Sequence, residues 1–346
     1  MLSENRESIR NISELDGLLS DPSAGVVEAM RRLEGDILLL GVGGKMGPTL
    51  GWMAKRASQM AGTKRRIIGA SRFSKDGLED VLQAHGIETI PCDLLDADSL
   101  DRLPDVPNIV YMAGMKFGAT GNEALTWAMN AHLPGLVARR FRKSRIVAFS
   151  TGNVYPLVPV TRGGSTEEDP LQPIGEYAMS CLGRERILEH FSRTLEIPMA
   201  ILRLSYAVEM RYGVLADIAT QVLNEQPIDL KMGSFVAIWQ GDANAMALQA
   251  FDHVSTPPTV LNLTGPEILS VRQVTEEFGR LLGREVRFTG EECGKALISS
   301  ARKAHGLFGY PRVPISQVIS WTADWVSRGG ETLGKPTHFE TTDGRF

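Results

Sequence analysis

The sequence predicts an α/β fold in which a doubly wound parallel sheet is joined to a smaller, partly interleaved C-terminal α+β lobe. Three observations support it. Short apolar runs alternate with helical segments, the first run ends in a glycine-rich turn, and the alternation loosens after about residue 205. Buried parallel strands read as continuous apolar runs because helices cover both faces of the sheet. Regular strand-helix alternation is therefore typical of a doubly wound sheet.

Six apolar runs predict the strands of this sheet: 36–41, 65–70, 87–92, 108–113, 145–150 and 198–204. Between them, helices are expected near 46–60, 76–85, 121–142 and 174–195. The C-terminal part predicts helices near 211–224, 241–252, 270–283 and 314–328, with short strand-like runs at 234–239 and 258–264. We assign these later segments to a second lobe on the C-terminal side of the sheet, the usual place for a cleft.

Composition excludes several classes of function. The 346 residues can bury a sizeable core, and 43% apolar with 23% charged residues is ordinary for a soluble globular protein. A formal net charge of −4 offers no long-range attraction for nucleic acid or an anionic membrane, so we expect neither as a partner. The polar N-terminus does not read as a secretory signal, and the longest apolar runs are too short to span a bilayer. Three scattered cysteines and six scattered histidines predict no disulfide framework and no metal site, which favours a cytoplasmic protein.

The first strand ends in the glycine-rich segment GVGGKMG, which begins the first helix of the sheet region. Gly41, Gly44 and Gly47 are spaced so that the turn can close and a pyrophosphate can approach the backbone and the helix N-terminus. At the start of a long βαβ series this pattern predicts a dinucleotide-binding (Rossmann) site, with Lys45 and Met46 in the same loop. The alternative is a tight packing turn that needs small residues.

Residues at the end of the second strand bear on the choice of dinucleotide. An acidic residue there would accept hydrogen bonds from the ribose of NAD, but the sequence has Ser71 and Arg72. A cation suits the 2′-phosphate of NADP, so NADP is slightly preferred over NAD. The alternative is that Arg72 is only a solvated charge at a strand end.

We divide the chain accordingly. An N-terminal helical extension would cover 1–35, and a dinucleotide-binding domain 36–205, with return segments near 234–255. A substrate lobe would cover 206–330, followed by a Gly-, Thr- and Pro-rich tail at 331–346.

Further motifs follow in a fixed order: CDLLDADSL after the third strand, Ala113-Gly114 at the end of the fourth, Asn130 in the next helix, FSTGNVYP at the end of the fifth, and Tyr177, Ser180 and Glu185 in the helix that follows. With these motifs, residues 36–285 resemble the extended short-chain dehydrogenase/reductase family, in its NAD(P)-dependent epimerase/dehydratase group. The resemblance implies that Thr151 is a catalytic hydroxyl and Tyr177 the general acid/base. It implies cofactor-binding roles for Asp93, Leu94, Ala113, Gly114 and Tyr177, with Asp93 on the adenine amino group.

The sequence departs from the family pattern at three places. Cys181 stands where the family has lysine, four residues after the tyrosine, and Tyr206 replaces the asparagine of the R-x-x-N signature. An Arg-Asp pair is missing before residues 236–245, although Asp242 fits the pattern. In the family, the asparagine that Tyr206 replaces and the Arg-Asp pair usually help to hold a nucleotide-diphosphate sugar. Their absence here favours a small sugar or sugar acid as the substrate.

Loss of the lysine matters because tyrosine has a pKa near 10, so only about a thousandth is ionised at pH 7. Tyr177 and Cys181 are one helical turn apart and share a face, and a neutral thiol supplies no charge. Three interpretations remain: a cation from elsewhere, best Lys116, replaces the lysine; the positive oxidised nicotinamide suffices; or the site only binds dinucleotide. Arg184 is expected to point along the helix towards a partner or solvent. The alternative for Lys116 is a solvated loop lysine with no role in the site. Cys181 is expected to be a small apolar residue that fills space, and the alternative for it is a redox or nucleophilic role.

The expected function is that of an NAD(P)-dependent oxidoreductase or epimerase acting on a hydroxyl or keto group of a sugar or sugar-acid-like small molecule. In it Lys116 would provide charge or bind a substrate carboxylate. The alternatives are a non-catalytic NAD(P)-binding sensor and a nucleotide-sugar epimerase or dehydratase with altered contacts. The resemblance also implies a possible homodimer through the helices at 121–142 and 174–195.

Overall fold

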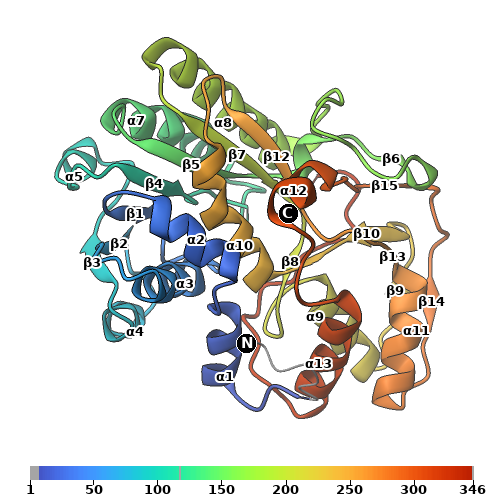
Figure 1. The fold of residues 1–346 in the computed structure, drawn as a ribbon. Helices are drawn as coiled ribbons and strands as arrows, with labels where there is room; N and C mark the ends of the chain where they lie inside the picture. The colour runs from blue at the N-terminus through green and yellow to red at the C-terminus, as the bar shows by residue number, and fades with distance from the viewer. Residues whose placement is uncertain (1–7, 117, 345–346) are drawn as a thin grey trace.

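The structure, a computed structural model, describes residues 8–116 and 118–344 and is built on a seven-stranded sheet (Figure 1). All its strand pairs are parallel, in the order β12-β7-β5-β4-β1-β2-β3. The strands are β1 (Ile37–Leu40), β2 (Ile67–Ser71), β3 (Glu88–Pro91), β4 (Asn108–Tyr111), β5 (Arg145–Thr151), β7 (Met199–Leu204) and β12 (Thr259–Leu263). The predicted doubly wound α/β class is confirmed.

Both faces of the sheet are covered by helices, as the continuous apolar strands required. Alternate residues of β1 enter different cores, because successive side chains of a strand point to opposite faces. Ile37 and Leu39 pack in one core, while Leu38 and Leu40 pack in the other. The first core is shared with α2 (Ala24–Arg32), α3 (Gly47–Met60) and α10 (Gln240–Gln249), and the second with α5 (Ala97–Asp101), α7 (Leu133–Arg140) and α8 (Gly175–Leu195).

Two predicted elements differ from the structure. The run 258–264 was expected in the second lobe, but β12 lies at the edge of the main sheet, with Thr259 opposite Ala200 of β7. The reason is α10, which packs on α2 and α3 and so carries the chain back to the sheet edge, where a parallel strand can pair. The helix expected at 121–142 is divided into α6 (Glu123–Trp127), a π-helical turn η1 (Ala128–His132) and α7.

The second lobe is centred on three helices that contact one another: α9 (Val214–Leu223), α11 (Val271–Leu282) and α13 (Ile315–Ser327). Its strands form short pairs: β8 (Ala207–Val208) with β11 (Ile238–Trp239), β9 (Ile228–Asp229) with β14 (Phe288–Thr289), and β10 (Ser234–Val236) with β13 (Ile268–Ser270). Further elements are α4 (Leu78–Ala84), α12 (Arg302–Phe308), and the pair of β6 (Val158–Pro159) with β15 (Lys295–Ala296).

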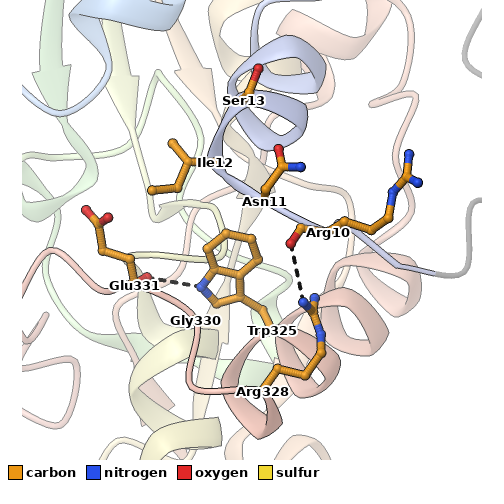
Figure 2. Close-up of a pocket in the computed structure, with 8 residues that line it drawn as sticks. All are labelled: Arg10, Asn11, Ile12, Ser13, Trp325, Arg328, Gly330 and Glu331. Atoms are coloured by element: carbon orange, nitrogen blue, oxygen red, sulfur yellow. Dashed lines mark hydrogen bonds between the residues drawn. The ribbon is translucent and has the colours of Figure 1, made fainter.

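Both ends of the described chain add to the core of this lobe. Leu15 and Leu19 of α1 (Ile12–Leu19) are fully buried in it, and so is Phe339 of the tail. Figure 2 shows the N-terminal segment against the end of α13, where Arg328 donates to the carbonyl of Arg10. An open cavity of about 550 Å³ lies here, and none of the predicted site residues lines it.

None of the described helices is both long enough and apolar enough to cross a membrane. Within residues 8–116 and 118–344, no three His, Cys, Asp or Glu side chains are grouped so that they could hold a metal ion.

Candidate active site

The predicted phosphate loop connects β1 to α3, and its glycines differ in whether packing requires them. A Cβ on Gly47 would collide with the carbonyl of Val42, and Gly41, at φ +89°, would place one 2.8 Å from the backbone nitrogen of Ala113. Tight packing therefore requires both of these glycines. Gly44 is different: it is exposed, and its Cβ would meet only the carbonyl of Gly41, at 3.4 Å. The packing-turn alternative explains Gly41 and Gly47 but not Gly44.

The start of α3 fits a phosphate. No side chain caps this 14-residue helix, whose N-cap position is Met46. The first N–H groups of a helix lack intrahelical partners and attract anions. Together with the space beside Gly44, they form a cradle that suits a dinucleotide pyrophosphate.

The residues predicted to bind adenosine follow the next two strands. Ser71 ends β2 so close to the loop that a Cβ on Gly43 would lie 2.5 Å from its hydroxyl oxygen. Arg72 is exposed, and no hydrogen bond or ion pair joins it to another described residue. Asp93 is also exposed and accepts from the backbone N–H of Leu95 (3.1 Å), while Leu94 is buried. Parallel strands bring all of these residues to one edge of the sheet.

The predicted catalytic hydroxyls meet at the same edge. Thr151 is the last residue of β5 and Tyr177 lies in the first turn of α8. Burial raises the pKa of Tyr177 well above its ordinary value, and the neighbouring Cys181 adds to the rise. The charge of Arg184 and a hydrogen bond with Thr151 act in the opposite direction. The phenol is therefore neutral at pH 7.

Lys116 lies between the tyrosine and the second lobe. Its Nζ is 6.0 Å from the centroid of the Tyr177 ring and donates to the carbonyl of Thr337 at 3.4 Å. Burial lowers the pKa of Lys116 to about 8, and the carboxylate of Asp217 opposes the shift. Lys116 is thus a partly buried group, in contrast to the solvated loop lysine of the alternative interpretation.

Lys45 connects the phosphate loop to the second lobe. Its Nζ donates to the carbonyl of Ala207 (2.8 Å) and lies 3.7 Å from the centre of the Tyr212 ring. Burial lowers the pKa of Lys45 to about 7, while the charge of Glu209 raises it. Glu209 also pairs with Arg211 at 3.1 Å. Sequence reasoning placed Lys45 in the loop but could not show that it reaches across to the lobe.

The C-terminal tail folds over this region. Thr337 donates to Asp217 through its N–H (2.8 Å) and its hydroxyl (2.5 Å), while its carbonyl accepts from Lys116. Gly344 packs so closely on the carbonyl of Ile174, just before α8, that a Cβ there would collide with it. A small cavity of about 250 Å³ lies between the tail and α9. The tail therefore connects the second lobe to the start of the helix that carries Tyr177.

Arg184 lies elsewhere than the sequence suggested. Its side chain points into the protein, where Nη1 donates to the carbonyl of Phe149 (2.8 Å) and Nη2 to Oδ1 of Asn130 (2.7 Å). The expectation that it faces a partner or solvent is wrong. The helical spacing of residues 177, 181 and 184 puts all three on one face, a signal that the sequence already contained.

Cys181 is fully buried, in a small apolar cluster with Val154 and Tyr155, and burial raises the pKa of its thiol. This environment matches a space-filling residue and does not activate a thiol.

The register of α8 is held by a buried ion pair. Glu185 accepts from Arg203 of β7 at 2.8 Å and from the hydroxyl of Ser150 at 2.6 Å. Arg203 also donates to the hydroxyl of Tyr155 at 2.7 Å. Because both charges are buried and hydrogen-bonded, the pair fixes α8 against the sheet and with it the position of Tyr177.

Comparison with known proteins agrees with this architecture. No curated protein sequence matches the chain. Similar solved structures include a UDP-glucuronic acid 4-epimerase from Bacillus cereus bound to UDP-glucuronic acid and NAD, with 18% identity, a TM-score of 0.69, and coverage of 85% of this chain and 99% of that one. A dTDP-glucose 4,6-dehydratase from Bacillus anthracis str. Ames in complex with NAD has 17% identity, a TM-score of 0.71, and coverage of 85% and 97%. A UDP-glucose 4-epimerase from Thermotoga maritima has 16% identity, a TM-score of 0.68, and coverage of 85% and 99%.

At these identities the likeness establishes the fold. The sequence match goes further, because residues 37–232, more than half of the chain, match the NAD dependent epimerase/dehydratase family. That stretch contains the phosphate loop, the edge of the sheet and the Thr151–Tyr177 pair. The chain belongs to the NAD dependent epimerase/dehydratase family.

Proposed function

We propose that the protein is an NAD(P)-dependent oxidoreductase or epimerase that acts on a hydroxyl or keto group of a sugar or sugar acid. One observation carries the proposal. Thr151 ends β5 and Tyr177 lies in the first turn of α8, so both hydroxyl-bearing residues stand at the edge of the sheet where the phosphate loop opens. In a doubly wound sheet, ligands bind at this carboxyl edge.

The described residues fit the cofactor that the family name implies. The α3 N-terminus and Gly44 would hold the pyrophosphate, and Asp93 the adenine. Ser71 and Arg72 would contact the adenosine ribose, and the exposed cation makes NADP a candidate beside NAD. When bound, the nicotinamide supplies hydride transfer to or from the substrate.

Tyr177 would move the proton that accompanies this hydride. As a neutral phenol it can donate to a keto oxygen, and the reverse direction requires its phenolate. Thr151 would hydrogen-bond the same reacting oxygen. Lys116 would bind a substrate anion, since its ammonium lies 6.0 Å from the centroid of the Tyr177 ring, on the side of the tail residue Thr337.

A small sugar acid is the first candidate because Lys116 offers a charge for its carboxylate. A nucleotide sugar is the second candidate, favoured by the ligand named for the similar Bacillus cereus epimerase, UDP-glucuronic acid. Both substrates carry the carboxylate, and they differ in the diphosphate that the second lobe would have to hold.

The test is turnover with purified protein. NAD⁺ and NADP⁺ are each incubated with a panel of free sugars, sugar acids, UDP-sugars and dTDP-sugars, with nicotinamide absorbance and sugar chromatography as readouts. We expect conversion of at least one compound, and its loss in Tyr177→Phe without loss of cofactor affinity. Unchanged turnover in Tyr177→Phe would refute the assigned mechanism. Cofactor binding without conversion of any compound would favour the alternative of a non-catalytic sensor.

We also infer a homodimer through α6 and α8. Three large apolar side chains on these helices are 38–48% exposed: Leu125, Trp127 and Met179. A second copy of the chain would cover them, in the pairing that the resemblance implies. Sedimentation should show a dimer that Leu125→Glu dissociates, and a monomeric native protein would contradict the inference.

A further inference from the structure

Arg184 is a buried cation at the cofactor edge of the sheet. It lies in α8 on the same face as Tyr177 and Cys181, and it is 6% exposed. Its guanidinium donates to the carbonyl of Phe149 and to both oxygens of Asn130, with Nε at 3.4 Å from the backbone oxygen. All of these acceptors are neutral.

No carboxylate of the described residues lies within ion-pair distance of Arg184. The adjacent acid, Glu185, is engaged with Arg203 and Ser150. A buried charge is costly unless an opposite charge compensates it, and proteins seldom retain one without a use. A buried guanidinium without an ion-pair partner among the described residues therefore points to an anion that forms or binds close to it.

The guanidinium occupies a specific gap. Gly114, just beyond β4, is exposed, and a Cβ there would collide with Nη2 of Arg184 and come within 3.0 Å of Oδ1 of Asn130. Asn130 lies in the π-helical turn η1, a feature frequent at functional sites. Its amide also binds the N–H and the carbonyl of Met115, both at 2.8 Å, and so fixes the loop that leads to Lys116.

We propose that Arg184 is the positioning residue that supplies positive charge to Tyr177 and stabilises its phenolate, in place of a lysine one turn along the helix. This inference rests on the proposed acid/base role of Tyr177. The charge of Arg184 lowers the pKa of Tyr177, whereas Lys116 has the carboxylate of Asp217 as its opposing charge.

The titratable and charged groups around the two side chains come from several elements. Tyr111 of β4 has its ring centroid 5.8 Å from the guanidinium carbon, and Cys181 and Glu185 belong to α8. Lys116 approaches from the loop after β4. Of the two cations, Lys116 loses its charge above about pH 8, whereas Arg184 keeps its charge because a guanidinium does not lose its proton in proteins.

The experiment measures the ionisation of residue 177 directly and needs no substrate. A fluorinated tyrosine is incorporated at position 177, so that the phenol ionises at lower pH, and ¹⁹F NMR follows its titration with and without NAD⁺. A nearby positive charge lowers the pKa of an acid, and Arg184 acts on Tyr177 in this direction. We expect Arg184→Met to raise the pKa of residue 177 and Arg184→Lys to raise it less.

Arg65 provides a matched control, because its buried guanidinium also donates to backbone carbonyls, those of Met30 and Leu33, at the opposite end of β2. Arg65→Met should lower the melting temperature without moving the titration. Equal titrations in native protein, Arg184→Met and Arg65→Met would overturn the proposal.

If Arg184→Met does not fold, Gly114→Ala tests the same point by displacing the guanidinium, and an unmoved titration there would also overturn the proposal. The titration is independent of turnover. A shifted pKa in a protein that converts no compound would retain the inference about charge while the proposed function failed.

Discussion

Gly44 and Gly47 offer a paired test of where the dinucleotide binds. In Gly44→Ala the new Cβ would lie 3.4 Å from the carbonyl of Gly41, an ordinary contact, and Gly44 does not have the positive φ that strains other residues. Replacing a permissive glycine by alanine stabilises a protein by about 0.4–1 kcal/mol through the unfolded chain. The methyl group would nevertheless occupy the side from which a pyrophosphate approaches.

Gly47→Ala should behave in the opposite way. Its Cβ would lie 2.6 Å from the carbonyl carbon of Val42 and closer still to the oxygen, and these are backbone atoms that cannot rotate away. Overpacking of this kind costs about 1–3 kcal/mol. We therefore expect a lower free energy of unfolding in Gly47→Ala, and an unchanged or slightly higher one in Gly44→Ala.

The assays are thermal denaturation and a fluorescence titration with NADH and NADPH. For Gly44→Ala we expect the cofactor to bind at least tenfold more weakly, a loss of about 1.4 kcal/mol of binding free energy. The melting temperature should not fall. Native affinity for both cofactors in a well-folded Gly44→Ala would show that the pyrophosphate does not lie over this loop, and the cofactor assignment would fail.

Three further predictions concern the rest of the site. Arg72→Ala should weaken NADP⁺ binding by roughly tenfold to a hundredfold and leave NAD⁺ unchanged, because a charge-assisted hydrogen bond to phosphate contributes about 1.5–3 kcal/mol; equal losses for both cofactors would contradict this. Burial lowers the pKa of Lys116 to about 8, so its charge is present below that pH and lost above it. Calorimetry should therefore show that the affinity for glucuronate falls by up to about tenfold per pH unit above pH 8. In Lys116→Met the affinity should be weak and independent of pH. Arg203→Met leaves the buried carboxylate of Glu185 without its ion-pair partner, so the free energy of unfolding in urea should fall by about 3–5 kcal/mol. Adding Glu185→Gln should recover much of this loss. If the effects of the two substitutions simply add, the pairing is refuted.

The sheet could be predicted because its strands follow one simple rule. A run such as Ile37–Leu40 is buried on both faces, so it shows as an uninterrupted apolar segment whatever its neighbours. The run at 259–263 obeys the same rule, but its place in the sheet depends on α10 packing against α2 and α3. Local sequence cannot show which helix returns a strand to the sheet.

The positions of the long cations were harder to predict than those of the strand ends. Gly44, Thr151 and Tyr177 have backbone positions set by strands and helix starts, and the structure has them along one edge. Lys45 and Arg184 have long, flexible side chains, and their charged ends are placed by Ala207 and Asn130, which are distant in sequence. Helical periodicity could have revealed the inward face of Arg184, but not its acceptors.

The sequence marks the tail by its Gly-, Thr- and Pro-rich composition but does not show where it packs, because a segment without periodicity does not specify a partner. Its position depends on Asp217, whose carboxylate accepts twice from Thr337, and on Phe339, which completes the core of the second lobe. The contact with Asp217 joins residues 120 positions apart in the sequence.

The net charge of −4 hides how unevenly the charge is distributed. The cations Lys45, Lys116 and Arg184 come from the phosphate loop, from the loop after β4 and from α8. The two lysines have lowered pKa values, so they lose charge near neutral pH unless an anion binds, whereas the arginine keeps its charge. An anionic substrate would therefore bind together with protons at the lysines. The charge of Arg184 would stabilise the phenolate of Tyr177 at every pH. Binding and proton transfer would then respond differently to pH, because different cations control them.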